Sequence, residues 1–493
     1  MPKSNLFLSK TKYLEGLRCP KLLWLEYNRK DLIPRPDAAT EHVFAEGRRV
    51  GEYAQKLFPD GLKIQRDFDP EKQDRKSKEA LKHRKPLFEA GFIFGRAYAL
   101  ADILVPVEED SWDLIEVKSS TSVKSEHYQD AAFQKYVYEG AGIKLRSCSI
   151  MYLNNQYVKV GPIEPDQLFA QKEITAEADN LKIGMEERIK NMIELISQKE
   201  MPGIKVGPQC RDIRDCILED MCFEFLPEED HILILYKGGK QKFELLERGI
   251  MKITDIPVEE LEGRQLIQVE SHKNKTIHIN KEEIAEFLKK IKFPAYFLDF
   301  ETIAPAIPVY DHSRPYLEIP FQYSLFVLDE ENAVPRHFTY LAPGDVDPRP
   351  QVLKTLKELL GDKGSILAYN AGFEQRCIKN ASEVYPEYIP WAEATNERFV
   401  DLIEPFKNFL YYNPVQEGSA SLKRVLPAIA GSSYKGLKIA EGQTAAAEYY
   451  RVTFGENIDE ADRRQVREAL LKYCDLDTKG MIDIFYALKE AVK

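Results

Sequence analysis

Two stretches of this chain place carboxylates inside otherwise apolar β-type runs, and this pattern limits the folds that the chain can adopt. The first stretch consists of GFIFGRAYALADILVPV and WDLIEVK, which are joined by the polar turn EEDS. This is the pattern of a β-hairpin. The second stretch is the strand-like run YFLDFET, which begins at Tyr296. Because helix-type segments accompany both stretches, we predict an α/β chain with two separate sheets.

The distribution of these segments divides the chain into three parts. At roughly 150 residues per domain, the 493 residues suggest about three domains. Residues 1–227 combine the hairpin with helical segments and a cysteine-rich patch. Residues 228–290 are a charged connector whose segment LLERGIMKITDIPVEEL vaguely resembles a phosphate-gripping helix-hairpin-helix, with an ordinary helical linker as the alternative. Residues 291–493 begin with the second acidic run and end in a long helix, from about 459 to 492.

Composition excludes several classes of protein. The chain is 44% hydrophobic, which is enough for buried cores and excludes a disordered protein. No stretch approaches 18 consecutive apolar residues, so we expect no membrane-spanning helix and no membrane partner. The N-terminus lacks an apolar signal core, and we expect a soluble, cytoplasmic protein. The net charge of −11 gives no overall basic surface for nucleic acid, but a local basic groove is compatible with it.

Acidic residues of the hairpin form the first candidate site. Glu116 and Lys118 lie two residues apart on one strand, so their side chains share a face. A hairpin partner that sets Asp102 beside Glu116 would place two carboxylates around a hard cation such as Mg²⁺ or Mn²⁺. Lys118 would then stabilise charge on a phosphate or orient the attacking water. The alternative interpretation is a hairpin with surface charges.

The residues that follow extend this pattern into a resemblance. Gln134 and Tyr138 are spaced i, i+4 on the next helix, at about 127–140, and share one face. The order Asp…Glu-x-Lys…Gln-x-x-x-Tyr resembles the RecB-like branch of the PD-(D/E)XK nuclease superfamily. The resemblance implies a restriction-endonuclease-like domain with two metal ligands and three catalytic side chains. The implied metal ligands are Asp102 and Glu116, and the implied catalytic side chains are Lys118, Gln134 and Tyr138.

The first core helix supplies one more residue of this comparison. Glu46 lies in VFAEGRRVGEYAQKLF, where these nucleases often carry an acidic residue or a histidine. The resemblance therefore implies that Glu46 is a third metal ligand. The histidine of the family's GxxxH pattern is absent, because Gly51 stands in its place.

Four cysteines form a separate constellation: Cys19, Cys210, Cys216 and Cys222. Four thiolates can ligate a [4Fe–4S] cluster. A Cys₄ zinc site is the rival, although zinc favours closer CxxC-type pairs, and unrelated buried cysteines are a third interpretation. One cysteine before the core and three after it resemble the iron–sulfur nucleases of the RecB-like group, which implies that all four are cluster ligands. Such a cluster would close a loop of about 190 residues and have a structural role.

The C-terminal part carries a second set of acidic residues. Asp299 and Glu301 share one face of a strand, Glu374 follows a later strand, and Tyr473 and Asp477 are spaced i, i+4 on the final helix. This order resembles the DEDD exonucleases of the RNase H-like fold, and the tyrosine marks their DEDDy subgroup. The resemblance implies a 3′→5′ exonuclease. Its four carboxylates would hold two divalent metals about 4 Å apart, and the tyrosine would orient the attacking water.

Several residues near this set have open roles. Glu374 stands where the family usually has Asp, and Asp401 in RFVDLIEPF is a possible supplementary ligand. LDFET followed by APAIPVYDHSRPYLEIPFQYS resembles a bacterial family of unknown function in which both nuclease types are fused. In that stretch Asp311, Arg314 and Gln322 would line a substrate cleft or belong to a packed loop. Three further cysteines are expected to be ordinary buried thiols: Cys148, Cys377 and Cys474.

Together these patterns predict a metal-dependent nuclease with two active sites, one [4Fe–4S] cluster and bound Mg²⁺ or Mn²⁺. Its partner would be nucleic acid, with DNA favoured over RNA; the sequence indicates no protein partner. The alternative is a nucleic-acid-binding scaffold with degenerate sites, which Glu374 and the missing histidine favour.

Overall fold

The chain folds into two compact units. The computed structural model describes residues 6–108, 110–210, 216–431 and 436–493. Unit 1 comprises Met1–Glu219 and Pro305–Leu317, and unit 2 comprises Asp220–Ala304 and Glu318–Lys493. The division falls close to the boundary expected at residue 227, but the expected connector is part of unit 2. Among the residues that the structure describes, no helix has the length and apolar character needed to cross a membrane.

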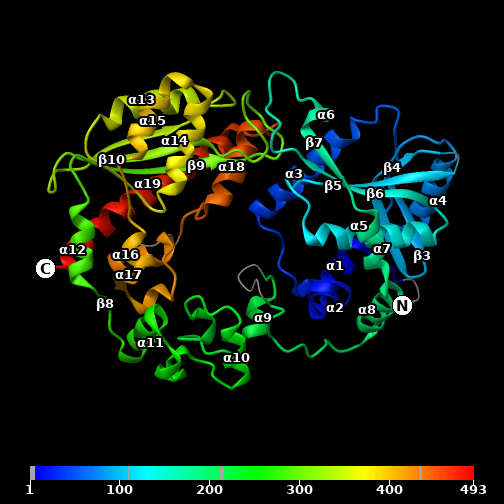
Figure 1. Cartoon of the computed structure of the whole chain (residues 1–493), viewed down its shortest axis with the longest axis horizontal. Helices are drawn as coiled ribbons and strands as arrows, with labels where there is room; N and C mark the ends of the chain where they lie inside the picture. The colour runs from blue at the N-terminus through cyan, green and yellow to red at the C-terminus, as the bar shows by residue number, and fades with distance from the viewer. Residues whose placement is uncertain (1–5, 109, 211–215, 432–435) are drawn as a thin grey trace. The chain divides into compact units, whose positions relative to one another are not determined.

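A seven-stranded mixed sheet forms the centre of unit 1 (Figure 1). Its order is β2-β3-β4-β5-β6-β7, and β1 pairs with β4. The predicted hairpin is confirmed, since β4 and β5 are antiparallel neighbours. β5 and β6 are parallel and are joined through α5. The strands are β1 (Leu8–Ser9), β2 (Leu62–Lys63), β3 (Leu87–Phe94), β4 (Ala97–Pro106), β5 (Ser111–Lys118), β6 (Lys144–Leu153) and β7 (Phe169–Glu173).

Helices pack on this sheet through an apolar core. Tyr13 of α1 stacks on Phe133 of α5 with ring centroids 4.7 Å apart, and both side chains are fully buried. A second cluster joins Val50 of α3 to the sheet and to Ala306 of the returning segment. The helices are α1 (Lys10–Arg18), α2 (Pro20–Asn28), α3 (Ala38–Gln55), α4 (Pro70–Leu81), α5 (Ser125–Gly140), α6 (Pro165–Leu168), α7 (Thr175–Lys182) and α8 (Met185–Ser197).

Unit 2 is built on a five-stranded sheet of order β11-β10-β9-β12-β13. β9, β10 and β11 are antiparallel neighbours, whereas β12 runs parallel to both β9 and β13. A separate pair, β14 and β8, is antiparallel. The strands are β8 (His278–Ile279), β9 (Ala295–Ile303), β10 (Ile319–Leu328), β11 (Arg336–Leu341), β12 (Ser365–Ala368), β13 (Phe399–Asp401) and β14 (Tyr411–Tyr412).

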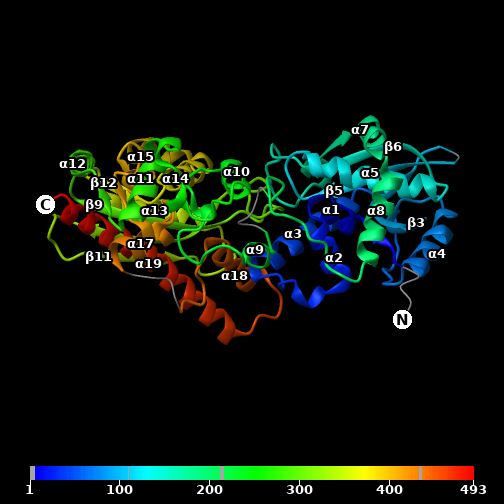
Figure 2. The same ribbon diagram turned by 90° about the horizontal axis from the view of Figure 1, so that it is seen from below.

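Alternation along β9 gives this sheet two apolar faces. Leu298 packs with α13, α14 and α15, whereas Phe297 packs with α12, α17 and α19. Figure 1 shows α19 on the opposite side of the sheet from α13 to α15, and Figure 2 shows the same elements turned by 90°. The helices are α9 (Glu219–Phe223), α10 (Gln241–Glu247), α11 (Gly263–Asn274), α12 (Lys281–Lys289), α13 (Arg349–Leu360), α14 (Gly372–Val384), α15 (Ile389–Asn396), α16 (Glu404–Lys407), α17 (Leu422–Ala430), α18 (Gly442–Phe454) and α19 (Glu460–Ala491).

Packing explains both the unbroken final helix and the folded connector. α19 is the helix expected at about 459 to 492, and it remains unbroken at Gly480. A Cβ at that position would lie 2.7 Å from Leu426 Cδ2, so the glycine permits the close approach of α17. The connector is more than a linker, because its residues form an apolar core of their own. This core includes Ile232, Leu235, Leu245, Ile253, Ile256, Leu261 and Val269.

Candidate active sites

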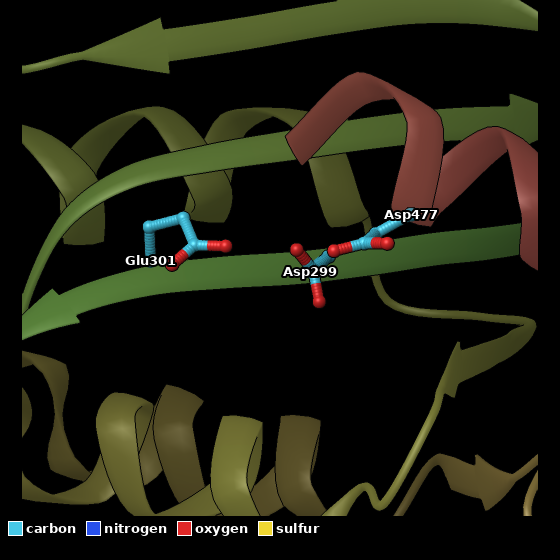
Figure 3. A group of neighbouring side chains, drawn as sticks. All are labelled: Asp299, Glu301 and Asp477. Atoms are coloured by element: carbon cyan, nitrogen blue, oxygen red, sulfur yellow. The ribbon is translucent and has the colours of Figure 1, made fainter. Parts of the chain in front are cut away.

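Three carboxylates converge in unit 2. Asp299 and Glu301 lie two residues apart on β9 and therefore share the sheet face that α19 covers. Asp477 reaches the same place from α19. The three residues each offer an oxygen, and these oxygens all lie within 4.8 Å of one another (Figure 3). Among the described residues, this is the one group of three or more ligand side chains with that spacing.

Burial and mutual repulsion perturb the carboxyl groups of this acidic triad (Asp299, Glu301 and Asp477). Burial, and next the Asp477 carboxylate, raise the pKa of Asp299 well above its usual range. Burial and the neighbouring carboxylates raise the pKa of Glu301 in the same way. Clustered oxygen donors with this excess of negative charge are the ligand set that Mg²⁺ and Mn²⁺ prefer. The donor chemistry of the triad therefore fits a divalent cation.

Glu374 adds a fourth carboxylate beside the triad. It lies in the first turn of α14 and is 2% exposed. Its Oε2 atom is buried and has no hydrogen-bond partner among the described residues. Burial, followed by the charge of Asp299, raises the pKa of Glu374 well above its usual range. Since a buried oxygen without a partner is costly, this side chain is suited to receive a cation.

The remaining residues expected at this site have different surroundings. Tyr473 is buried one helical turn before Asp477. Asp401 instead closes a backbone turn, because its Oδ1 accepts hydrogen bonds from the amides of Asn370 (2.8 Å) and Ile403 (3.1 Å). Its expected role as a supplementary ligand stays a prediction.

Cys474 is a residue of this site that the sequence interpretation missed. Like Cys148 and Cys377 it is buried, as expected. Its thiol, however, lies 3.4 Å from Asp299 Oδ2 and donates to it. Burial, and then the surrounding carboxylates, raise the pKa of the Cys474 thiol well above its usual range, so it remains protonated. The available signal was its position directly after Tyr473 and three residues before Asp477, on the same helical face.

A second cluster forms in unit 1 around Glu116. This carboxylate is 2% exposed and accepts hydrogen bonds from three side chains. Lys10 and Lys118 approach its Oε1 at 2.6 Å and 2.7 Å, and Gln134 donates to its Oε2. Burial alone would raise the pKa of Glu116, but the two lysines hold it far below its usual value. Glu116, Lys118 and Gln134 therefore lie together, as the sequence predicts.

Asp102 lies beside this cluster on β4. Its Oδ2 accepts a hydrogen bond of 2.7 Å from the backbone amide of Val117, the residue between Glu116 and Lys118. Burial, followed by the charge of Glu116, raises the pKa of Asp102 to about 8. The two carboxylates thus have opposite protonation tendencies, because the lysines bind one of them directly.

Two residues expected in the first site make other contacts. The Tyr138 hydroxyl accepts from the amide of Ala101 at 2.7 Å and donates to the carbonyl of Ala90, so it ties α5 to β3 and β4. Glu46 Oε2 accepts a hydrogen bond of 2.7 Å from the amide of Ala306. Glu46 is not grouped with Asp102 and Glu116 in a compact ligand set among the described residues. Its role as a metal ligand stays a prediction.

Lys10 and Asp130 are two members of the Glu116 cluster that the sequence interpretation missed. Asp130 lies on α5 one turn before Gln134, and this spacing was the available signal. It contacts both lysines, at 3.4 Å for Lys10 and more closely for Lys118. Lys10 is 106 residues from Glu116, and no local pattern indicates its position.

The stretch with Asp311, Arg314 and Gln322 is divided between the units. Asp311 forms an ion pair with Lys159 and accepts from the amide of Gly161 at 3.1 Å, within unit 1. Arg314 belongs to the same exposed segment. Gln322 lies in the sheet of unit 2, where its side chain donates to the carbonyl of Leu470 at 2.9 Å. The packed-loop interpretation therefore fits Asp311.

Two of the four expected cluster cysteines line one cavity of unit 1. Cys19 ends α1, and its Sγ accepts from the amide of Leu22 at 3.5 Å at the start of α2. Cys19 and Cys216 face a cavity of about 590 Å³ that also has Leu14 and Leu218 in its walls. No disulfide joins any of the seven cysteines, all of which lie among the described residues. Among the described residues the four cysteine thiols do not form a compact group of ligand atoms, so the expected [4Fe–4S] cluster stays a prediction.

The other two cysteines, Cys210 and Cys222, are not among the residues that line this cavity. Cys210 precedes residues 211–215, which lie outside the described residues. Cys222 lies on α9, in the part of the chain assigned to unit 2. Their expected roles as cluster ligands stay predictions.

Residues 296–421 match a family model described as a domain of unknown function, DUF2779. The matched range contains Asp299, Glu301 and Glu374 but ends before Asp477. The range is about a quarter of the chain, and it contains three of the four carboxylates of the site in unit 2.

Curated relatives are named as uncharacterized proteins. The MG366 homolog of Mycoplasma pneumoniae is 28% identical over 223 residues, 41% of this chain and 33% of that protein. MG366 of Mycoplasma genitalium is 26% identical over 226 residues, with the same two coverages of 41% and 33%. UU173 of Ureaplasma parvum is 25% identical over 244 residues, 45% of this chain and 35% of that protein. The chain thus matches about a third of the length of these relatives.

A solved structure titled "Crystal structure of SSO0001" is similar at a TM-score of 0.24 and 17% identity. It covers 46% of this chain and 90% of the other. A likeness of this size carries no argument about the fold.

Proposed function

We propose that this chain is a metal-dependent nuclease that hydrolyses phosphodiester bonds of nucleic acid, with DNA favoured over RNA. The observation that carries the proposal is the acidic triad, whose oxygens lie within 4.8 Å of one another beside the unpartnered Oε2 of Glu374. Several neighbouring carboxylates are costly to keep charged in a buried site unless metal ions bind them. Two bound metals in such a site stabilise the attacking and leaving oxygens of a phosphoryl transfer.

In unit 2 the proposed reaction is 3′→5′ exonucleolytic cleavage of the DEDD type. Bound Mg²⁺ or Mn²⁺ would lower the pKa of the attacking water. The attacking water would give up a proton to solvent as its oxygen forms a bond to phosphorus, and the leaving sugar oxygen would take a proton from solvent as its bond to phosphorus breaks. Within the chain, Asp299, Glu301 and Asp477 hold the metals. Tyr473, one turn from Asp477, would orient the water.

In unit 1 the proposed reaction is hydrolysis by a PD-(D/E)XK-type site. Its support is the cluster in which Lys118 and Gln134 contact Glu116, with Asp102 beside it on the neighbouring strand. Asp102 and Glu116 would hold one divalent metal. Lys118 would stabilise the negative charge that develops on the phosphate.

A [4Fe–4S] cluster on Cys19, Cys210, Cys216 and Cys222 is part of the same proposal. The cavity that Cys19 and Cys216 share supports it. When bound, the cluster would supply a cross-link between the start of α2 and the segment that follows the sheet. The thiols themselves would then act in stability rather than in the reaction.

Cleavage of labelled oligonucleotides tests the nuclease proposal. Single- and double-stranded DNA and RNA are incubated with Mg²⁺ or Mn²⁺, and products of the wild type are compared with those of Lys118→Ala and Asp477→Asn. Each variant should lose one activity and keep the other. Asp475→Asn is the matched control, since Asp475 lies on the same helix but pairs with His337 at 3.1 Å. Absence of metal-dependent cleavage with all four substrates would refute the proposal.

The alternative is a nucleic-acid-binding scaffold. It would bind the same oligonucleotides without cutting them, and the Asp477→Asn variant would bind and behave as the wild type. The missing GxxxH histidine and the glutamate at position 374 favour this alternative.

A further inference from the structure

The Glu116 carboxylate is occupied by two ammonium groups from different elements. Lys118 comes from β5, which also carries Glu116, and Lys10 begins α1. Both amines approach the same atom, Oε1, at 2.7 Å and 2.6 Å. Gln134 donates to the other oxygen, Oε2. A metal ion that uses Glu116 as a ligand must therefore displace at least one of these donors.

Lys10 is the amine that is held less strongly. Lys118 has a second, very close contact with Asp130, whereas Lys10 lies 3.4 Å from that carboxylate. The Lys10 side chain is 21% exposed, although Glu116 itself is only 2% exposed. The Lys118 side chain is exposed to nearly the same extent, 20%, so the difference between the two amines lies in their contacts with Asp130.

The backbone of Lys10 is nevertheless fixed beside the sheet that carries the site. The preceding residues, Leu8 and Ser9, form β1 and pair with Ala97 and Tyr98 of β4. Ser9 caps α1 by accepting from the Lys12 amide at 3.4 Å. The next turn of α1 is anchored by the stack of its Tyr13 on α5. Lys10 is thus preorganised in the way that a functional side chain requires.

We infer that Lys10 is a further catalytic residue of the unit 1 site, which neutralises Glu116 before a metal ion binds and then contacts the phosphate of the substrate. The inference rests on the proposed nuclease function. Displacement moves one positive charge from a carboxylate to a phosphate oxygen as the metal replaces it. No proton or covalent bond changes place on the lysine. Its contribution is electrostatic: a point charge beside the negative charge that grows on the phosphate.

The test uses the full chain with Asp299→Asn and Asp477→Asn, so that only unit 1 is measured. In this background Lys10→Met removes the charge and keeps most of the side-chain length. Lys12→Met is the matched control, because Lys12 lies on the same helix but pairs with Glu15 and Glu26. The readouts are the affinity for Mn²⁺, by calorimetry, and the single-turnover rate of oligonucleotide cleavage.

Two opposite changes are expected from Lys10→Met. Mn²⁺ should bind about fivefold more tightly, because a competing cation is lost and coupled ligands typically change affinity by such factors. Cleavage at saturating Mn²⁺ should slow about 100-fold, as when one electrostatic donor is removed from a transition state. The control should change neither. If Lys10 had only a structural role, its replacement would lower both the Mn²⁺ affinity and the cleavage rate or leave them unchanged. An unchanged Mn²⁺ affinity or an unchanged rate therefore overturns the inference.

Folding and the proposed function are tested separately. If Lys10→Met fails to melt cooperatively, Lys10→Gln, which can still donate to Glu116, is measured for the same two changes. If the background protein cleaves and Lys118→Met abolishes cleavage while Lys10→Met does not, the nuclease function stands and the role of Lys10 is refuted. If the background protein does not cleave at all, the proposed function of unit 1 fails, and the catalytic role of Lys10 fails with it.

Discussion

The Cys474 thiol on α19 lies 3.4 Å from Oδ2 of Asp299 on β9, so a metal-ligand candidate has a hydrogen-bond donor behind it. Groups that bind the outer oxygen of a ligating carboxylate fix its orientation, and their loss typically weakens metal binding about 10- to 100-fold. The Cys474 thiol, which the sequence presents as an ordinary buried thiol, therefore helps to orient the Asp299 carboxylate of the acidic triad.

We predict that Cys474→Ala weakens Mn²⁺ binding by unit 2 about tenfold. Cys474→Ser should stay close to the wild type, because its hydroxyl can still donate to Asp299. Calorimetric titration with Mn²⁺ in a Glu116→Gln background measures the difference. Cys377→Ala is the control, since Cys377 is a fully buried thiol on α14. Equal affinities for the Ala and Ser variants would show that the thiol has no orienting role.

We predict that Asp299→Asn stabilises the metal-free protein while it removes metal binding. Burial raises the pKa of Asp299 and of Glu301, so the folded state disfavours their charged forms. Relief of about 1 kcal/mol would raise the Tm of unit 2 by about 2 to 4 °C. Differential scanning calorimetry in EDTA measures this shift, and a lower Tm would contradict it.

The same carboxylates give a pH dependence with a definite sign. Their pKa values in the folded state lie above the unfolded value of about 4. The unfolded chain therefore loses these protons first, and the stability of the metal-free wild type should fall as the pH rises above about 4. The fall should be smaller in Asp299→Asn. Melting scans in EDTA at several pH values should show converging Tm values for the two proteins at low pH.

We predict that Glu374→Gln inactivates trimming by unit 2. The amide keeps the size of the side chain but removes the negative charge beside Asp299. Glu374→Asp should retain activity or increase it, because that change restores the residue usual in the resembling family. Single-turnover trimming in the Lys118→Ala background provides the rates. Full activity of Glu374→Gln would exclude Glu374 from the metal centre.

We predict that anaerobically purified protein is brown and carries about four irons per chain, the number in one [4Fe–4S] cluster. Cys216→Ala should lose iron and lower the Tm of unit 1, because Cys216 shares its cavity with Cys19. Cys148→Ala is the control, since that thiol is buried in the core of unit 1 and is not among the residues that line the cavity of Cys19 and Cys216. Stoichiometric zinc without iron would contradict the assignment.

Local periodicity accounts for the parts of both sites that could be predicted. The spacing of two residues along a strand is enough to place Asp299 beside Glu301 and Glu116 beside Lys118. Helical spacing likewise relates Tyr473 to Asp477. Each of these relationships depends on one element, so no knowledge of the tertiary fold is needed.

Other contacts at these sites join elements that are distant in the sequence. Lys10 reaches Glu116 only because β1 pairs with β4, and a two-residue strand leaves almost no pattern in the sequence. Glu46 received the role of a metal ligand from its place on the first core helix, but its carboxylate binds the amide of Ala306, 260 residues away. Tyr138 has the expected spacing from Gln134, yet its hydroxyl is bound by backbone groups of the sheet.

The segment Pro305–Leu317, which packs in unit 1, determines the order in which that unit can be completed. During synthesis the buried Glu46 carboxylate has no amide to bind until Ala306 has left the ribosome, long after the sheet of unit 1 is finished. A fragment that ends at Glu219 would lack the amide donor of Glu46 and would leave Val50 of α3 without its contact to Ala306. An expression fragment of unit 1 should therefore be designed with residues 305–317 restored, for example by a linker that carries them after residue 219.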